Sequence, residues 1–146
     1  MRLIVGVFLI CFSSVYAQKK VSQKDSLDIV KTLFKQQADW NSGDIDAFME
    51  GYFKSDELVF SGSSGPIYGW EATRDRYKKS YSSRLLMGQL EFEVLSMIQL
   101  SPTVIQLQGS FYLTRDIEDS SGFFTLIWLQ KEGNWLVISD HTSSSN

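Results

Sequence analysis

Apolar residues between positions 22 and 52 recur at intervals of three and four, which is the spacing of one face of an α-helix. A first helix is predicted to begin at Ser22 or Ser26, since serine is a favoured N-cap, and to end at Gly43, which suits the left-handed conformation after a helix. Asp44 is placed to cap a second helix. The predicted apolar faces comprise Leu27, Val30, Leu33, Phe34, Ala38 and Trp40 in the first helix, and Ile45, Phe48, Met49 and Tyr52 in the second.

The pattern changes in the last third of the chain to runs rich in Val, Ile, Phe and Trp, which favour strands. Four consecutive strands are predicted at residues 89–100, 103–115, 122–131 and 134–140. Before them, the pattern indicates a short strand at 58–60, a glycine–serine loop at 61–66, and a third helix from Tyr68 or Gly69 to Tyr81. The basic residues of this helix, Arg76 among them, are expected on its solvent side. Helices followed by a run of antiparallel strands predict an α+β domain with a coiled sheet.

The first 17 residues have the features of a secretory signal peptide. Arg2 precedes a run of ten apolar residues, Leu3 to Phe12, and Val15-Tyr16-Ala17 forms a small-x-small cleavage site. Such a run is too short to span a bilayer, which takes about 20 residues; a short membrane anchor is the alternative. We therefore expect residues 1–17 to be cleaved and residues 18–146 to form one domain. That domain would be exported to the periplasm or secreted, with no membrane partner.

Charge and cysteine content narrow the functional classes. The chain has 14 Lys and Arg residues against 17 Asp and Glu, a formal net charge of −3, and no basic run longer than two residues. Nucleic-acid binding requires a concentrated positive surface, so no nucleic-acid partner is expected.

Cys11 is the sole cysteine and His141 the sole histidine, which excludes the common zinc sites. We expect no metal and no cofactor. Without Cys11 the mature chain would depend on its core rather than on disulfides.

Several segments carry a resemblance to a known superfamily. They are residues 40–48 (Trp-Asn-Ser-Gly-Asp-Ile-Asp-Ala-Phe), Gly51-Tyr52-Phe53 before a strand, Gly69-Trp70-Glu71-Ala72, and residues 135–143. They resemble the nuclear transport factor 2-like superfamily, and in particular the SnoaL-like and ketosteroid isomerase-like domains of bacterial exported proteins. The resemblance implies a cystatin-like cone, in which a curved antiparallel sheet wraps around N-terminal helices. It also implies a homodimer formed through the outer face of the sheet.

Two positions depart from the ketosteroid isomerases within this superfamily. Where those enzymes carry a tyrosine in the first helix, this chain has Gln36, and where they carry a catalytic aspartate it has Phe60 or Ser61. Proton abstraction next to a carbonyl needs a positioned base and an oxyanion donor. Since the resemblance supplies neither group, steroid isomerisation is not expected.

The end of the final strand concentrates polar chemistry in Asp140-His141-Thr142-Ser143. Histidine titrates near neutral pH, so His141 and Asp140 are the candidate acid/base pair. Neighbours on a strand point to opposite faces, so either the strand has ended by Asp140 or only one of the two faces the interior. A hydrogen-bonded cluster that fixes the chain end and a lining for a pocket are the alternatives to catalysis.

Arg115 ends a strand whose apolar residues share one face with it. An arginine at the end of an apolar face needs a carboxylate, and Asp140 is the expected partner. Alternatively, its planar fork of donors could bind a carboxylate or phosphate of a ligand.

Large aromatic residues form the second group of candidates, and ordinary core packing is the alternative explanation for them. A wall of rings with polar tips suits an apolar ligand with a few oxygens. The predicted ligand-binding residues are Trp40, Tyr52, Phe60, Tyr77, Tyr81, Trp128 and, as the polar member, Arg115.

The combined pattern predicts an exported domain that binds a small, mostly apolar molecule without strong catalysis. One alternative is a cyclase, isomerase or hydratase that uses His141 and Asp140 as acid and base. The other is an interaction module that dimerises through the outer sheet face.

Overall fold

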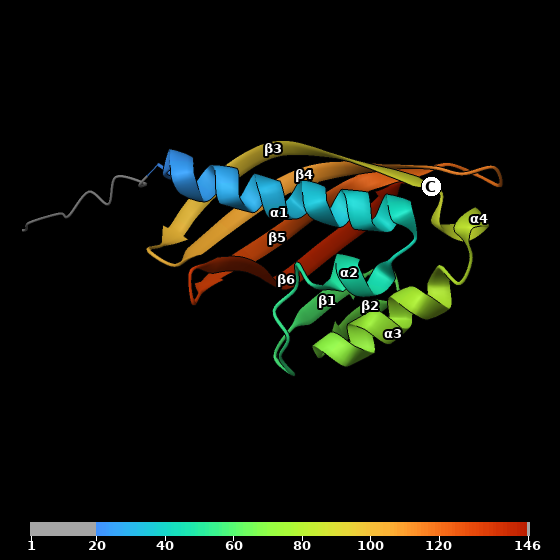
Figure 1. The fold of residues 1–146 in the computed structure, drawn as a ribbon, viewed down its shortest axis with the longest axis horizontal. Helices are drawn as coiled ribbons and strands as arrows, with labels where there is room; N and C mark the ends of the chain where they lie inside the picture. Colours follow the sequence, from blue (N-terminus) through green and yellow to red (C-terminus); the bar gives the residue numbers. More distant parts are fainter. Residues whose placement is uncertain (1–19, 146) are drawn as a thin grey trace, which may run out of the picture.

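A six-stranded sheet curves around a long helix in the computed structural model, which describes residues 20–145 (Figure 1). The helices are α1 (Gln23–Ser42), α2 (Ile45–Met49), α3 (Trp70–Ser80) and α4 (Arg84–Met87). The strands are β1 (Val59–Gly62), β2 (Gly65–Tyr68), β3 (Gln89–Ser101), β4 (Val104–Thr114), β5 (Ser120–Lys131) and β6 (Asn134–Ser145). Their order across the sheet is β2-β1-β6-β5-β4-β3. The predicted α+β class is confirmed.

Helix α1 begins and ends, and helix α2 begins, where the capping residues predict. Tyr52, which was predicted to belong to the second helix, lies beyond its end at Met49 and forms an isolated β-bridge with Val137. The side chain of Ser22 accepts a hydrogen bond from the backbone N–H of Asp25 at 3.1 Å, and Gly43 ends α1 with a φ of 91°. Asp44 caps α2 by accepting a hydrogen bond from the backbone N–H of Ala47 at 2.9 Å. These caps fix the short turn that sets α2 against the end of α1.

The buried face of α1 differs from the predicted one. Leu27 and Phe34 are 60% and 42% exposed, and Ala38 is exposed too. The helix carries apolar residues on two sides, and only the side turned toward the sheet loses contact with water. The buried residues are Ile29, Leu33, Gln36 and Trp40.

The region between α2 and α3 is more ordered than predicted. The expected glycine–serine loop at 61–66 is a hairpin, in which Gly62 of β1 pairs with Gly65 of β2. Strand β1 then pairs in parallel with β6, so the sheet is mixed rather than wholly antiparallel. The short helix α4 was not predicted, because its four residues are too few to show a periodic pattern.

The edge strand β3 is held against α1 by side chains of the helix. Asn41 accepts a hydrogen bond from the backbone N–H of Leu90 at 2.6 Å and donates one to its carbonyl at 2.9 Å. The side chain of Gln37 accepts from the N–H of Phe92 at 2.7 Å. These bonds pair backbone groups that an open sheet edge leaves free, and they fix the helix over the concave face of the sheet.

Residues 1–17, the predicted signal peptide, lie outside the described residues. Within residues 20–145, no helix combines the length and apolar character needed to cross a membrane.

Candidate functional site

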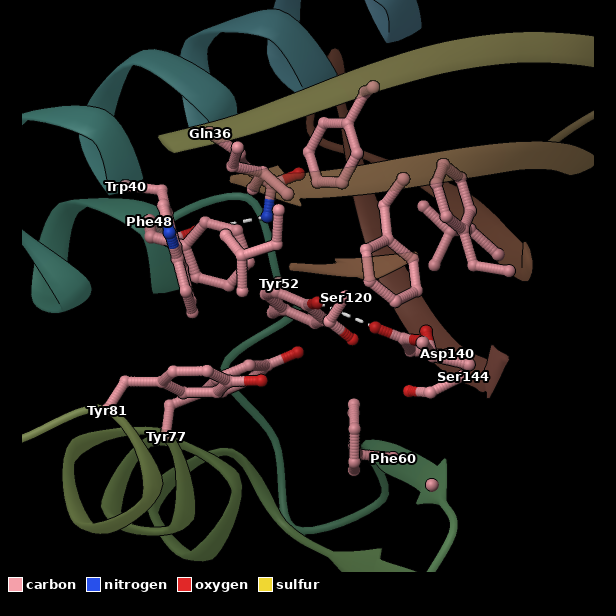
Figure 2. Close-up of a pocket in the computed structure, with 18 of the residues that line it drawn as sticks. Gln36, Trp40, Phe48, Tyr52, Phe60, Tyr77, Tyr81, Ser120, Asp140 and Ser144 are labelled. Atoms are coloured by element: carbon pink, nitrogen blue, oxygen red, sulfur yellow. Dashed lines mark hydrogen bonds between the residues drawn. The ribbon is translucent and has the colours of Figure 1, made fainter. Parts of the chain in front are cut away.

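A cavity of about 120 Å³ lies between helices α1, α2 and α3 and the concave face of the sheet (Figure 2). Its apolar wall comes from α1 and from strands β3, β4 and β5. Its polar groups come from α1, the segment after α2, the β1–β2 turn, α3, the start of β5 and β6. The apolar wall consists of Leu33, Leu90, Phe92, Phe111, Leu113, Phe124 and Leu126.

Tyr77 of α3 is the centre of the aromatic cluster beside this cavity. Its ring lies 5.3 Å from that of Phe48, 5.5 Å from Phe60 and 6.0 Å from Trp40, in each case edge to face. The ring of Tyr81 stacks on it at 6.1 Å with an interplanar angle of 26°. Edge-to-face contacts at these distances are favourable for aromatic pairs. The two tyrosines lie one helical turn apart, so both line the cavity, as their spacing predicts.

Asp140 is the buried acid of the cavity. Its side chain is 3% exposed and accepts two hydrogen bonds of 2.7 Å, from the hydroxyl of Tyr52 to Oδ2 and from that of Thr142 to Oδ1. Figure 2 shows the Tyr52–Asp140 bond at the polar side of the cavity. Phe60 on β1 and Leu126 on β5 are its register partners and line the same cavity.

A β-bulge decides that Asp140, and not His141, faces the cavity. Val137 faces the core, and simple alternation along β6 would turn His141 inward with it. The register between β5 and β6 shifts at Ile138, because Ile127 pairs with Ser139 while Trp128 pairs with Val137. The extra residue reverses the alternation. His141 is therefore exposed on the opposite face, and the predicted acid/base pair does not meet in the cavity.

The buried groups have shifted pKa values. Burial raises the pKa of the Asp140 carboxyl, against the opposing effects of the hydrogen bonds from Tyr52 and Thr142 and of the Arg76 charge. Burial, followed by the neighbouring Asp140 charge, raises the pKa of Tyr52 and of Tyr77 well above the usual phenol value. Both phenols therefore keep their protons at neutral pH and can act as hydrogen-bond donors.

Arg76 is the arginine of the cavity, whereas the sequence pointed to Arg115. The Arg76 guanidinium lies over the Phe60 ring, 4.4 Å from its centroid, and is half-buried rather than on the solvent side of α3. Arg115 lies outside the cavity lining, and its Nε donates to the carbonyl oxygen of Glu118 at 2.7 Å. The expected Arg115–Asp140 ion pair is absent from the described part of the chain. In the loop after β4, the Arg115 side chain bonds to the backbone of Glu118 instead of reaching Asp140.

Gln36 occupies the position at which the resemblance anticipated a tyrosine. It is 3% exposed, lines the cavity, and donates a hydrogen bond from Nε2 to the carbonyl oxygen of Phe48 at 3.0 Å. Gly51 makes room for it, because a Cβ at that position would overlap the Gln36 side chain.

Of the predicted ligand-binding aromatics, one lies apart from the cavity. Trp128 is fully buried in the core, and its indole nitrogen has no hydrogen-bond partner among the described residues. The others, which all line the cavity, are Trp40, Tyr52, Phe60, Tyr77 and Tyr81.

Sequence reasoning missed Gln36, Phe48 and Arg76 as lining residues. Two features of the sequence could have indicated them. Phe48 lies four residues before Tyr52, and Arg76 is next to Tyr77 in the chain. The ligand-binding roles of these side chains stay a prediction.

The described residues, 20–145, include no group of three or more His, Cys, Asp or Glu side chains placed to hold a metal ion. Asp140 stands in the cavity as a single carboxyl, with hydroxyl groups rather than further acids around it. The chemistry available there is hydrogen bonding, ion pairing and proton transfer.

The helices laid on a curved sheet and the cavity at their contact define the cystatin-like class of α+β proteins. A nuclear transport factor 2-like protein of unknown function from Shewanella oneidensis MR-1 is 32% identical to this chain, with 82% of this chain and 98% of that one covered and a TM-score of 0.78. The chain belongs to the nuclear transport factor 2-like superfamily.

More distant structures show the same fold. A ketosteroid isomerase-like protein from Erwinia carotovora atroseptica has 14% identity, coverage of 86% of this chain and 99% of that one, and a TM-score of 0.70. A protein of unknown function with a cystatin-like fold from Nostoc punctiforme has 13% identity, coverage of 87% and 96%, and a TM-score of 0.70. No protein-family model and no curated protein matches the sequence.

Proposed function

We propose that the cavity binds a small, mostly apolar molecule whose polar group contacts Asp140, and that the protein carries this molecule without strong catalysis. The observation that supports this most directly is the position of a buried carboxyl inside a wall of aromatic and aliphatic side chains. Ligand sites commonly combine such walls with a few placed polar groups that fix the orientation of the ligand. The Tyr52 and Thr142 hydroxyls hold the carboxyl in one orientation.

Displacement of a hydrophobic fluorophore from residues 18–146 tests this proposal. Tyr81→Ala removes a ring from the cavity wall and should weaken fluorophore binding about tenfold, which corresponds to about 1.4 kcal/mol. Tyr68→Ala is the matched control, since that tyrosine is 65% exposed on β2 and lies outside the cavity. Equal effects of the two substitutions, or no binding by the unaltered protein, would contradict the proposal.

A second candidate is an enzyme that transfers a proton, such as an isomerase or cyclase. It is favoured by the contact between Asp140 and the protonated Tyr52, with Tyr77 close by, because an acid and a neutral donor can serve as base and oxyanion donor. His141 faces away and would take no part. In such an enzyme Asp140→Asn should abolish turnover while ligand binding persists, and His141→Ala should leave the rate unchanged. A lower rate in His141→Ala would argue against this assignment.

Export and dimerisation also remain proposals. The outer face of the sheet exposes apolar side chains, with Phe123 at 62% and Tyr112 at 44% exposure, and this supports a homodimer through that face. Sedimentation of residues 18–146 should give a dimer at micromolar concentration, and Phe123→Glu should convert it to a monomer.

Export should yield a mature protein that starts at Gln18 in the periplasm or medium, as N-terminal sequencing would show.

A further inference from the structure

Asp140 is a buried carboxyl that forms no ion pair within 4.0 Å among residues 20–145. The ion pairs in the described residues all lie elsewhere, on exposed helix surfaces. Its two hydrogen-bond partners, Tyr52 and Thr142, are neutral hydroxyls, and a carboxylate has about four lone-pair sites. Acceptor capacity therefore remains, and Asp140 lines the cavity. Buried charges in proteins are normally paired, which leaves a place for a positive charge brought by the ligand.

The walls next to Asp140 suit a cation as well. Phe60 is its neighbour across the β1–β6 pair, Tyr52 touches it, and the ring of Tyr77 lies 5.5 Å from that of Phe60. The faces of aromatic rings attract alkylammonium groups, most strongly where water is excluded. In the described structure Phe60 already binds a cation in this way, the Arg76 guanidinium at 4.4 Å.

Arg76 is the positively charged group that competes for Asp140 inside the cavity. Its charge acts on the Asp140 carboxyl, yet the two side chains form no ion pair within 4.0 Å. An ammonium in hydrogen-bond contact with Asp140 would be closer to the carboxyl than the guanidinium is, and Coulomb attraction falls with distance. A ligand carboxylate placed beside Asp140 would instead meet a like charge.

We propose that the cavity takes an organic cation, a ring-sized primary amine whose ammonium group pairs with Asp140 and whose apolar body lies against the wall formed by Phe124 and Leu126. This rests on the proposed binding function and names the class of ligand. The ammonium would donate to the free lone pairs of Asp140, and the hydroxyls of Tyr52 and Thr142 would keep the carboxyl oriented toward it.

Three probes of similar shape separate the possibilities: benzylamine, benzyl alcohol and benzoate, each titrated into residues 18–146 by calorimetry at neutral pH. A charge-assisted hydrogen bond is stronger than a neutral one, so benzylamine should bind at least about tenfold more tightly than benzyl alcohol. Asp140→Asn should remove that preference. Asp119→Asn is the matched control, since this exposed carboxyl bonded to Tyr112 lies outside the cavity, and it should leave the preference intact.

Benzyl alcohol or benzoate binding as tightly as benzylamine would overturn the cation assignment while the binding function survives. A preference for benzylamine that persists in Asp140→Asn would also overturn it, because the cation would then bind elsewhere. If none of the three probes binds and the fluorophore is not bound either, the binding function itself is wrong. Should Asp140→Asn fail to fold, the unaltered protein decides: its affinity for benzylamine should rise with pH as Asp140 ionises, and a flat profile contradicts the proposal.

Discussion

Trp128 buries an indole N–H that has no acceptor within the described part of the chain, although its side chain is fully inside the core. Trp70 offers the opposite case, since its indole nitrogen donates to the carbonyl oxygen of Met49 at 2.9 Å. An unsatisfied buried donor costs about 1–3 kcal/mol. Both tryptophan side chains are buried. They differ in that, within residues 20–145, only the indole N–H of Trp70 has a hydrogen-bond acceptor.

This difference predicts unequal effects of the same substitution. Trp128→Phe and Trp70→Phe both remove part of a buried ring, but only the second also breaks a hydrogen bond, whereas the first removes an unsatisfied donor. The Met49 carbonyl oxygen keeps the bond that it accepts from the backbone N–H of Tyr52 at 3.1 Å. Trp128→Phe should thus reduce the free energy of unfolding by about 1–2 kcal/mol less than Trp70→Phe does. Urea denaturation of the two variants provides the measurement. A larger loss in Trp128→Phe would mean that the indole N–H has an acceptor after all, such as a buried water.

At the scale of single elements, the hairpin between β5 and β6 contains a backbone conformation unusual for its residue. Glu132 has a φ of 52° and is followed by Gly133 with a φ of 82°. Two successive positive φ angles characterise the tight hairpin turns that favour Asn-Gly. A non-glycine residue in this region costs roughly 1–2 kcal/mol, and asparagine tolerates it better than glutamate.

Glu132→Asn should therefore stabilise the domain, by about 0.5–1 kcal/mol. Glu118→Asn makes the same change of charge in the loop before β5, where the backbone is not in this region, and should leave stability nearly unchanged. Thermal or urea unfolding of both variants tests the turn itself. Equal shifts in the two would show that charge, and not backbone conformation, is responsible.

The capped ends of the helices could be predicted from the sequence, because neighbouring residues determine them. Ser22, Gly43 and Asp44 mark helix ends by hydrogen bonds and by backbone preference, and the structure places the ends there. The inward face of α1 and the orientation of Asp140 depend instead on partners distant in sequence. The bulged residue Ile138 has no local signature, since it lies in an ordinary apolar run, yet it turns Asp140 into the cavity.

In the candidate site, too, side chains set by local spacing were predictable, and side chains set by distant contacts were not. Tyr77 and Tyr81 could be placed together because one helical turn separates them. Arg115 could not be distinguished from Arg76, because the choice depends on the path of the loop after β4 and on the rotation of α3. The clustering of aromatics in the cavity was predictable, and the identity of the charged group beside them was not.

For the whole molecule, the buried carboxyl makes stability depend on pH. Burial raises the pKa of Asp140 in the folded state above the value of about 3.9 expected for an unfolded chain. Below both values the carboxyl is protonated in both states, and its burial carries no charge penalty. As the pH rises from about 3.9 through the folded-state pKa, the unfolded state ionises first and the free energy of unfolding falls. Above the folded-state pKa this loss is complete and constant.

Exposed carboxyls with lowered pKa values act in the opposite direction. Asp119 is one of them, because its hydrogen bond from Tyr112 favours the charged form. The effect of Asp140 is therefore seen in a difference between two proteins. The free energy of unfolding of the unaltered protein minus that of Asp140→Asn should decrease as the pH rises from about 3 through the folded-state pKa of Asp140, since asparagine does not ionise. Urea denaturation across this range measures the difference. If it were flat, or rose with pH, the carboxyl would be ionised in the folded state from low pH onward. Arg76 would then be its effective counter-ion, and the cavity would have no uncompensated charge for a ligand to neutralise.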